Sequence, residues 1–234
     1  MGQEVEVMGN SERPVSYMLS NYLQDYRDLL EGMFAAKKRL CPPGTVFCMD
    51  GAENSTIYFL LSGTVKIYTL NAAGYERIIG YHRRNTIFAM GGLIGGISRI
   101  SSESVTSVDV IPLTEEDLKR IGALRPDFFR DLARYYAVIL RLMCFDAENQ
   151  SNDSVYVRLI NFLELCMQSE EGGQGQVPGL SQEELSSLLN CSRVQLTRVC
   201  TQLKEEGVIS TQRRRITIED PRRLIRLVAE EYKK

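Results

Sequence analysis

Two closely spaced capping boxes in the C-terminal third constrain the fold of this chain more than any other sequence feature. Ser181 with Glu184 predicts the start of one helix, and Ser192 with Gln195 predicts the start of the next. Asn190 lies between them and tolerates the left-handed conformation that ends a helix, so the connection is only a few residues long. Two short helices joined by such a turn form a helix-turn-helix.

The second of these helices is expected to keep a polar face. The apolar positions are Leu185, Leu188 and Leu189 in the first helix, and Leu196, Val199, Cys200 and Leu203 in the second. Away from them, Arg193 and Thr197 share one edge, and Val194 and Arg198 share the next. The first turn of such a helix reaches base edges in the major groove of DNA. Arg193 can pair with guanine through two hydrogen bonds, whereas Val194 can only make apolar contact, for example with a thymine methyl group.

A β-hairpin with a basic tip is expected after these helices. Gly207 ends the second helix, and Val208–Ser210 and Ile216–Ile218 have the composition of two strands. The tip holds Arg213, Arg214 and Arg215. These arginines suit contact with DNA phosphates, the alternative being a charge run that is only solvated. A last helix opens at Asp220-Pro221 and completes a predicted winged helix.

Upstream, the hydrophobic pattern is mainly that of strands. Residues 1–15 are polar and predict a flexible tail, and residues 17–40 carry apolar positions at helical spacing. Short β-branched and aromatic runs follow at intervals of roughly ten residues. They are Thr45–Met49, Thr56–Leu61, Thr64–Thr69, Glu76–Tyr81, Thr86–Met90 and Ser104–Leu113. This spacing favours an antiparallel sandwich or barrel.

Helices are expected again after the acidic run that begins at Thr114. Pro126 suits the first turn of a long helix, because its missing N–H is unpaired there in any case. A narrow apolar stripe follows this helix at spacings of three and four residues: Phe129, Leu132, Tyr136, Ile139 and Met143. The stripe predicts a dimer seam, and the alternative is packing on the chain's own domain. A break at Glu148–Asp153 precedes a further helix, Val155–Gln168.

These elements predict an α+β chain in four parts. They are a flexible tail (1–15), an effector-sensing β-roll (16–125), a dimerisation helix with a hinge (126–152) and a winged helix-turn-helix DNA-binding domain (153–234). Charge supports the last part: residues 177–234 hold 11 Lys and Arg against 8 Asp and Glu, although the whole chain carries −2. A basic C-terminal end on an acidic body indicates a surface that faces nucleic acid.

Composition argues against several other classes of protein. No apolar run reaches about 18 residues and the N-terminus is no secretory signal, so we expect a cytoplasmic protein without membrane spans. The six cysteines form no C-x-x-C pair, which argues against a zinc site or a disulfide framework. With His82 as the only histidine and no visible nucleophile–base set, paired catalytic carboxylates or nucleotide motif, the chain is not expected to be an enzyme.

The chain resembles the superfamily of the cyclic AMP receptor protein and the fumarate–nitrate regulator (CRP/FNR) over about residues 20–225. The resemblance is most specific in Ser-Gln-Glu-Glu-Leu and Asn-Cys-Ser-Arg of residues 181–193, in Gly-Val-Ile-Ser of 207–210, and in the β-run 57–65. It implies a homodimeric bacterial transcription factor with a β-roll sensor, a long dimer helix and a winged helix. The implied DNA-reading positions are Arg193, Val194, Thr197 and Arg198, and Ser181, Gln182 and Ser192 complete the predicted DNA-binding set.

Departures from the family pattern argue against cyclic AMP as the effector. Members that bind cyclic nucleotide carry a Gly-Glu pair and then an Arg-Ser pair, which hold ribose and phosphate. Here residues 88–92 read Phe-Ala-Met-Gly-Gly without an acid, and Arg99 and Ser101 lie out of register with the second pair. On the long helix, Met143 and Cys144 replace the small hydroxylated pair that contacts adenine.

Two cofactors of the family are also not expected. Members with an iron–sulfur cluster carry closely spaced cysteines near the N-terminus, and no cysteine here precedes Cys41. Haem-sensing members use a histidine where this chain has Gly91, and we interpret His82 as a turn residue. The sequence therefore predicts no haem and no iron–sulfur cluster.

An effector pocket is expected between the β-roll and the long helix. Its apolar lining is predicted to be Met90, Leu93, Tyr136, Leu140 and Met143, and its polar anchors Tyr81, Arg83 or Arg84. That mixture suits a small, partly apolar acid such as a substituted aromatic carboxylate. Gly91 and Gly92, with the glycine pair that follows at 95–96, could instead bind a phosphate through bare N–H groups. A further alternative is that these are core residues without a ligand.

The sequence thus predicts a homodimeric, effector-gated regulator of transcription that binds a palindromic operator and RNA polymerase. Because Val194 stands where many members place a cytosine-reading Glu, A·T-richer half-sites are expected, as in relatives that control anaerobic respiration or reductive dehalogenation. Two alternatives stay open. One is a thiol-gated regulator that uses Cys191 or Cys144, and the other is a module whose winged helix mediates protein contacts.

Overall fold

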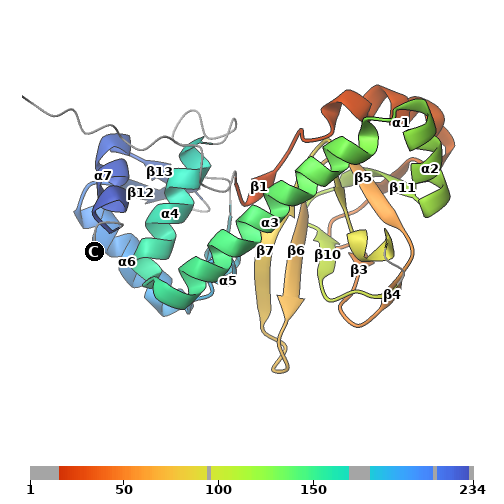
Figure 1. Ribbon diagram of the computed structural model, residues 1–234. Coiled ribbons are helices and arrows are strands. Elements are labelled where there is room, and N and C mark those ends of the chain that lie inside the picture. The colour runs from red at the N-terminus through yellow and green to blue at the C-terminus, as the bar shows by residue number, and fades with distance from the viewer. Residues whose placement is uncertain (1–15, 94–95, 169–179, 213–214, 232–234) are drawn as a thin grey trace, which may run out of the picture.

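The computed structural model describes residues 16–93, 96–168, 180–212 and 215–231. A β-rich N-terminal half and a mainly helical C-terminal half lie at opposite ends of one long helix (Figure 1). The α+β class, the β-roll, the long helix and the winged helix-turn-helix that the sequence predicts are confirmed.

Two sheets form the β-roll. One has the order β1-β7-β6-β10-β3, made of Met18–Leu19, Glu76–His82, Val65–Leu70, Ser101–Ser104 and Val46–Cys48. The other has the order β2-β11-β5-β8, made of Arg39–Cys41, Val108–Leu113, Ile57–Ser62 and Thr86–Phe88. A short pair, β4 (Glu53–Asn54) with β9 (Gly96–Ile97), lies apart from both. Of these pairings only β1 with β7 is parallel.

The β6–β7 hairpin contains an irregularity that matters for the site. Ile67 pairs with Gly80 and Tyr68 pairs with Ile78, so Ile79 is an extra residue on β7. Such a bulge interrupts the alternation of side chains between the two faces of a strand. The alternation of faces along β7 is therefore out of step before and after Ile79, so that Ile78 lies on the same face as Tyr81 and opposite to Gly80 and His82.

The helix expected over residues 17–40 is only partly present, and this prediction is corrected. Helix α1 covers Arg27–Met33, flanked by 3₁₀ turns at Gln24–Tyr26 and Ala35–Lys37. Met18–Leu19 instead pair with β7, close to Gly80, where an added Cβ would lie 3.1 Å from the Tyr17 carbonyl oxygen. The apolar spacing was real, because these side chains enter the core, but pairing with a distant strand outweighs local helix preference there.

The helices downstream agree closely with the sequence. Helix α2 (Glu115–Leu124) opens on a capping box in which Thr114 Oγ1 accepts from the Asp117 N–H and the Asp117 carboxylate accepts from the Thr114 N–H. Helix α3 covers Phe128–Asn152 and continues through most of the predicted break, so chain direction changes only at Asp153. Helix α4 then covers Val155–Gln168.

The winged helix follows as predicted. Its elements are α5 (Gln182–Leu188), α6 (Arg193–Glu205), β12 (Ile209–Gln212), β13 (Arg215–Ile218) and α7 (Pro221–Glu231). Asn190 has φ of 48° at the turn and Gly207 has φ of 71° after α6, as the sequence requires of both.

One hydrophobic cluster joins the two halves of the molecule. Buried residues of β1, β6, β7 and α3 pack with those of α4, α5 and α6. A second cluster lies inside the β-roll beneath the first half of α3. The winged helix is thus docked on the outer face of the β7 sheet in this structure. None of the described helices is long and apolar enough to cross a membrane.

Candidate DNA-reading face and sensor cavity

The start of α6 presents the predicted reading residues to solvent. Ser192 Oγ accepts from the Gln195 N–H at 3.2 Å, and Gln195 Oε1 accepts from the Ser192 N–H at 3.0 Å. Buried Leu196 and Leu203 hold the opposite side of the helix against the domain. This local geometry fixes which face of α6 is polar and exposed.

The exposed face matches the predicted set. Arg193, Val194, Thr197 and Arg198 are all exposed, and Val194, at 70% exposure, is unusually open for an apolar side chain. Thr197 Oγ1 donates to the Arg193 carbonyl oxygen at 2.8 Å, so its proton is already used and the group is left as an acceptor and a methyl. An exposed apolar residue between two arginines suits a base edge that carries a methyl group.

The remaining predicted phosphate-contact residues lie at the start of α5 and in the wing. Ser181 Oγ accepts from the Glu184 N–H at 3.1 Å, and Gln182 is exposed beside it. Arg215 is exposed at the start of β13, whereas Arg213 and Arg214 lie outside the described residues.

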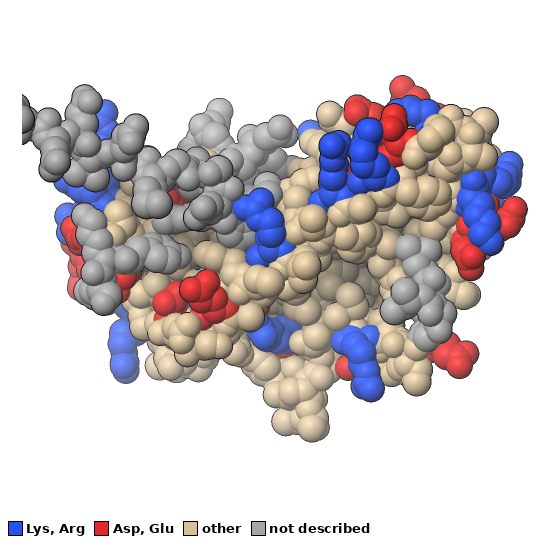
Figure 2. Space-filling model, viewed as in Figure 1, with Lys and Arg blue, Asp and Glu red and all other residues tan. Residues whose placement is uncertain are grey.

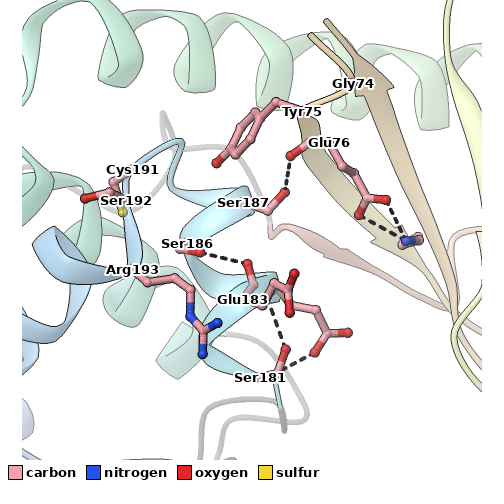
Figure 3. A pocket seen from close by; sticks show the side chains of 12 residues that line it. Gly74, Tyr75, Glu76, Ser181, Glu183, Ser186, Ser187, Cys191, Ser192 and Arg193 are labelled. Atoms are coloured by element: carbon pink, nitrogen blue, oxygen red, sulfur yellow. Dashed lines mark hydrogen bonds and ion pairs between the residues drawn. The ribbon is translucent and has the colours of Figure 1, made fainter.

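Helix α5 is hydrogen-bonded to the backbone of strand β7 through the side chain of Ser187. Ser187 Oγ donates to the Glu76 carbonyl oxygen at 2.8 Å and accepts from the Ile78 N–H at 3.0 Å. Figure 3 shows Ser187 directed at Glu76, with Arg193 extended into open space beside Glu183. Sequence reasoning missed this contact because it joins residues 109 or more positions apart, and no local pattern marks it.

A cleft of about 520 Å³ separates the reading residues from the β6–β7 hairpin. Its walls include Lys66 and Glu76 on the hairpin side and Ser181, Ser192 and Arg193 on the other. The tip of the hairpin, residues 71–74, projects from the molecule without a charged side chain (Figure 2). Three residues of the predicted DNA-binding set therefore face the sensor domain in this conformation.

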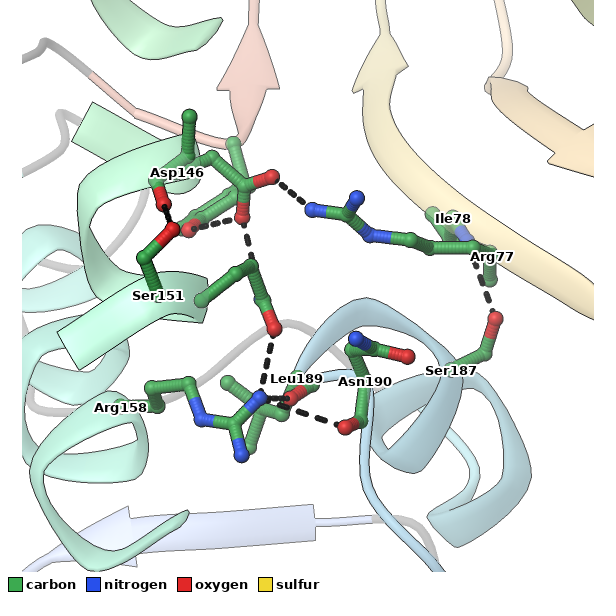
Figure 4. Close-up of polar contacts among 11 residues, drawn as sticks. Arg77, Ile78, Asp146, Ser151, Arg158, Ser187, Leu189 and Asn190 are labelled. Atoms are coloured by element: carbon green, nitrogen blue, oxygen red, sulfur yellow. Dashed lines mark hydrogen bonds and ion pairs between the residues drawn. The ribbon is translucent and has the colours of Figure 1, made fainter. Parts of the chain in front are cut away.

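A chain of polar contacts connects β7 to the turn of the helix-turn-helix (Figure 4). The Arg77 guanidinium is paired with the carboxylate of buried Asp146 on α3. Gln150, one turn later, donates to Asp146 and accepts from Arg158 Nη1 of α4 at 2.5 Å. Arg158 also donates to the carbonyl oxygens of Leu189 and Asn190, at 2.7 Å and 3.2 Å.

A second cavity, of about 130 Å³, lies between the β-roll and α3. The lining residues that were predicted are Met90, Tyr136 and Met143. Sequence reasoning missed Gly80 and His82 of β7, and also Leu19, Ile67, Ile79, Ile87, Phe88, Ala89, Ile100, Ile139 and Leu142. The alternation of side chains along β7 would have predicted that Gly80 and His82 line the cavity if the sequence had revealed the bulge at Ile79.

Several predicted lining residues are not brought to this cavity. Tyr81 faces the cluster shared with the winged helix, and Arg83 lies near Cys166 of α4, because both sit on the opposite face of β7 from His82. Arg84 and Leu140 are exposed. Gly91, Gly92 and Leu93 belong to a 3₁₀ turn, Met90–Leu93, in which Met90 lines the cavity, whereas the side-chain positions of 92 and 93 lie outside the described ones.

His82 is a buried strand residue, which corrects its interpretation as a turn residue. It ends β7, and its Nδ1 is hydrogen-bonded to the Tyr135 hydroxyl at 2.7 Å. Burial lowers the pKa of His82 to about 3, so the ring is neutral at physiological pH.

Most residues of the predicted dimer stripe are buried or half-buried on α3. Leu132 is 6% exposed and packs inside the β-roll, and Tyr136, Ile139 and Met143 are half-buried on the cavity side, so only Phe129 of the predicted stripe is well exposed. Exposed apolar or small residues instead follow spacings of four and three: Ala133, Ala137, Leu140, Cys144 and Ala147. We call these five residues the α3 stripe.

The cysteines are mostly shielded. All six lie in described parts of the chain, and among them only Cys144 is exposed. Burial raises the pKa of Cys191, Cys166 and Cys200, which lowers thiolate reactivity. Across the described residues, no group of three or more His, Cys, Asp or Glu side chains is arranged to hold a metal ion.

Comparison with known proteins gives one consistent result. The family described as Cyclic nucleotide-binding domain matches residues 38–123, and the Crp-like helix-turn-helix domain matches residues 157–227. The transcriptional activator protein FnrA of Stutzerimonas stutzeri is 21% identical over 207 residues, 86% of this chain and 84% of the relative. The cyclic AMP receptor protein of Thermus thermophilus is 25% identical over 174 residues, 74% of this chain and 79% of the relative.

Solved structures agree with these relatives. A CooA variant from Carboxydothermus hydrogenoformans superposes with a TM-score of 0.76 at 16% identity, covering 90% of this chain and all of that one. A CprK variant complexed with OCPA gives a TM-score of 0.74 at 17% identity, covering 92% of this chain and 99% of that one. Both halves of the molecule thus lead to the same conclusion, that the chain belongs to the CRP/FNR family of DNA-binding transcription regulators.

Proposed function

We propose that this protein is a homodimeric, sequence-specific regulator of transcription, gated by a small molecule in the cavity between the β-roll and α3. The observation that carries the proposal is the position of β7. One face of this strand lines the cavity through Gly80 and His82, and the strand also holds α5 of the helix-turn-helix at Glu76 and Ile78. A ligand in the cavity therefore acts on the same strand that holds the DNA-reading domain.

DNA recognition is assigned to the exposed face of α6. Arg193, Val194 and Arg198 would contact bases, with Thr197 as an acceptor or methyl contact. Ser181, Gln182, Ser192 and the wing arginines 213–215 would contact phosphates. Val194 offers nothing to a cytosine amino group, so we expect A·T-richer half-sites.

Dimerisation is assigned to the α3 stripe. Small side chains at this spacing allow close approach of a second helix, and Leu140, at 64% exposure, supplies an apolar contact at its centre. Two recognition helices placed in this way would read half-sites about 34 Å apart, one turn of DNA. Recruitment of RNA polymerase at such operators, in the bacterial cytoplasm, completes the proposed role.

The docked arrangement would be the state of low DNA affinity. Arg193, Ser181 and Ser192 line a cleft of about 520 Å³, a space far too small for a duplex. The two states must differ in affinity for both DNA and ligand if one is to control the other.

Thiol gating is the weaker alternative. The raised pKa of Cys191 argues against a switch at the turn, so this reading depends on exposed Cys144 in the α3 stripe. Equal operator affinity with and without reductant would eliminate it.

The experiment that tests the proposal is selection from a randomised DNA pool with the purified protein at fixed salt. We expect a palindrome with half-sites one helical turn apart, rich in A·T where Val194 reads. Val194→Glu should move that position toward C·G, while Leu124→Glu, exposed on α2, should leave the selected sequence unchanged. A single half-site without symmetry would contradict the dimer, and no enrichment at any salt concentration would contradict DNA reading.

A further inference from the structure

The cavity between the β-roll and α3 is small and without formal charge. None of the described residues that line it is Asp, Glu, Lys or Arg, and most are Ile, Leu, Met or Phe. Its one titratable base, His82, has a pKa lowered to about 3 by burial and is neutral. The wall therefore offers a ligand mainly apolar contact.

The volume of the cavity limits the size of the ligand. The cavity measures about 130 Å³. An apolar cavity of about 150 Å³ in another protein is known to bind benzene or xenon. A single six-membered ring is thus the scale of molecule that fits, whereas a nucleotide is much larger.

The cations that could attract an acid are directed elsewhere. Arg83 lies on the other face of β7 near Cys166, and burial lowers its pKa. Arg77 is paired with Asp146, and Arg84 is exposed. An anion in this cavity would be buried without a counter-charge, which is strongly unfavourable. The anchors that favoured an aromatic carboxylate are therefore not at this site.

One polar group beside the cavity is left without a partner. Tyr136 lines the cavity, and its hydroxyl is buried with no hydrogen-bond partner among the described residues. The neighbouring hydroxyl, of Tyr135, is by contrast bonded to His82. A buried hydroxyl without a partner is costly, and a ligand that pairs with it removes that cost.

Together these observations specify a ligand class. Resting on the assignment of this cavity as the effector site, we propose that it binds a neutral, largely apolar molecule about the size of one aromatic ring, with a single hydrogen-bonding group that pairs with the Tyr136 hydroxyl. The recognition differs in kind from that of a cyclic nucleotide or a carboxylate, because no ionic contact contributes to it.

The test is calorimetric titration of the purified full-length protein with four probes at pH 7.5. Phenol and toluene are neutral and ring-sized, benzoate is a ring-sized anion, and cyclic AMP is a larger anion. We expect phenol to bind most tightly and toluene next, with no detectable heat from benzoate or cyclic AMP.

Two variants locate the site and the polar contact. Ile139→Phe fills the cavity and should abolish binding of phenol and toluene, while Leu124→Phe, exposed on α2, should preserve both. Tyr136→Phe should weaken phenol roughly five-fold and leave toluene unchanged, because only phenol uses the hydroxyl. Tyr156→Phe, in the other domain, is the matched control and should alter neither affinity.

The outcomes separate this inference from the proposed function. Tighter binding of benzoate or cyclic AMP than of phenol would overturn it, as would equal phenol affinity in wild type and Ile139→Phe. Binding of no probe, with operator selection intact, would overturn the ligand class and leave the DNA-binding regulator standing. Phenol binding that depends on Tyr136, in a protein that selects no DNA, would support the cavity and contradict the proposed function.

Discussion

The two faces of strand β7 differ in chemistry although they belong to the same seven residues, Glu76–His82. On one face, Gly80 and His82 border an uncharged cavity. The rest of the strand meets the winged helix and α3 through hydrogen bonds to Ser187 and the ion pair of Arg77 with Asp146. The first environment is uncharged and mainly apolar, and the second adds directional polar contacts to the apolar packing of Ile78 and Tyr81.

This difference indicates that the cavity side of β7 accommodates a ligand and that the hydrogen bonds of β7 hold the DNA-reading domain. Apolar contacts depend weakly on orientation, so the cavity can close on a ligand by small shifts of β7. Hydrogen bonds weaken steeply with distance and angle, so the same shifts can break the contacts to α5. Ligand binding and docking of the DNA-reading domain are therefore coupled, because the apolar cavity contacts and the hydrogen bonds to α5 belong to the same strand, β7.

The largest effect is expected at the ion pair. Asp146→Ala leaves Arg77 and the Tyr17 hydroxyl without their shared acceptor, and we expect the free energy of unfolding to fall by about 3 kcal/mol. Urea denaturation of variant and wild type measures the change. Glu115→Ala, which removes an exposed pair with Lys119, is the control and should leave the unfolding midpoint unchanged. Equal midpoints for Asp146→Ala and wild type would show that the polar contacts of α3 do not stabilise the docked arrangement.

A smaller effect is expected from pH on the cavity side. The pKa of His82 is lowered to about 3, against about 6.5 in an unfolded chain, so the unfolded state binds more protons as the pH falls. Its contribution to stability is complete above pH 6.5 and declines toward pH 3, with a loss of about 2 kcal/mol at pH 5. Denaturation at pH 5 and pH 7.5 should show this loss in wild type and a much smaller one in His82→Gln. The same loss in both proteins would mean that His82 is not buried neutral.

The smallest effect is expected at the docking serine. Ser187→Ala removes the partner of the Ile78 N–H and the Glu76 carbonyl oxygen, which costs the docked state about 1 kcal/mol. Operator affinity without effector should therefore rise about five-fold, measured by fluorescence anisotropy. Ser186→Ala is a close control, because the Ser186 hydroxyl donates only within α5, to the Glu183 carbonyl oxygen. A fall in affinity for Ser187→Ala would show that docking favours DNA binding.

The helix-turn-helix could be predicted almost completely from the sequence. Its signals are local: the serine caps reach three residues, and Asn190 and Gly207 act through their own φ angles. Local geometry of this kind does not depend on the rest of the fold. The exposed position of Val194 followed from the same helix.

The cavity could be predicted only in part, because its walls depend on long-range pairing. One bulge residue, Ile79, decides that His82 rather than Tyr81 faces α3, and no turn or cap in the sequence marks it. On α3 the spacing of three and four residues recurs in two stripes, the predicted seam and the α3 stripe. Leu132 faces the β-roll and Leu140 faces solvent. A helix that is covered on one side by its own sheet can still present a second stripe to a partner.

Operator affinity with the cavity empty and occupied tests the central claim most directly. The measurement is anisotropy of a labelled operator duplex at fixed salt, titrated with wild type and with Ile139→Phe, each with and without saturating phenol. We expect phenol to change the Kd of the wild type at least five-fold and to leave that of the filled-cavity variant unchanged. An identical Kd for the wild type with and without bound phenol would contradict coupling through β7.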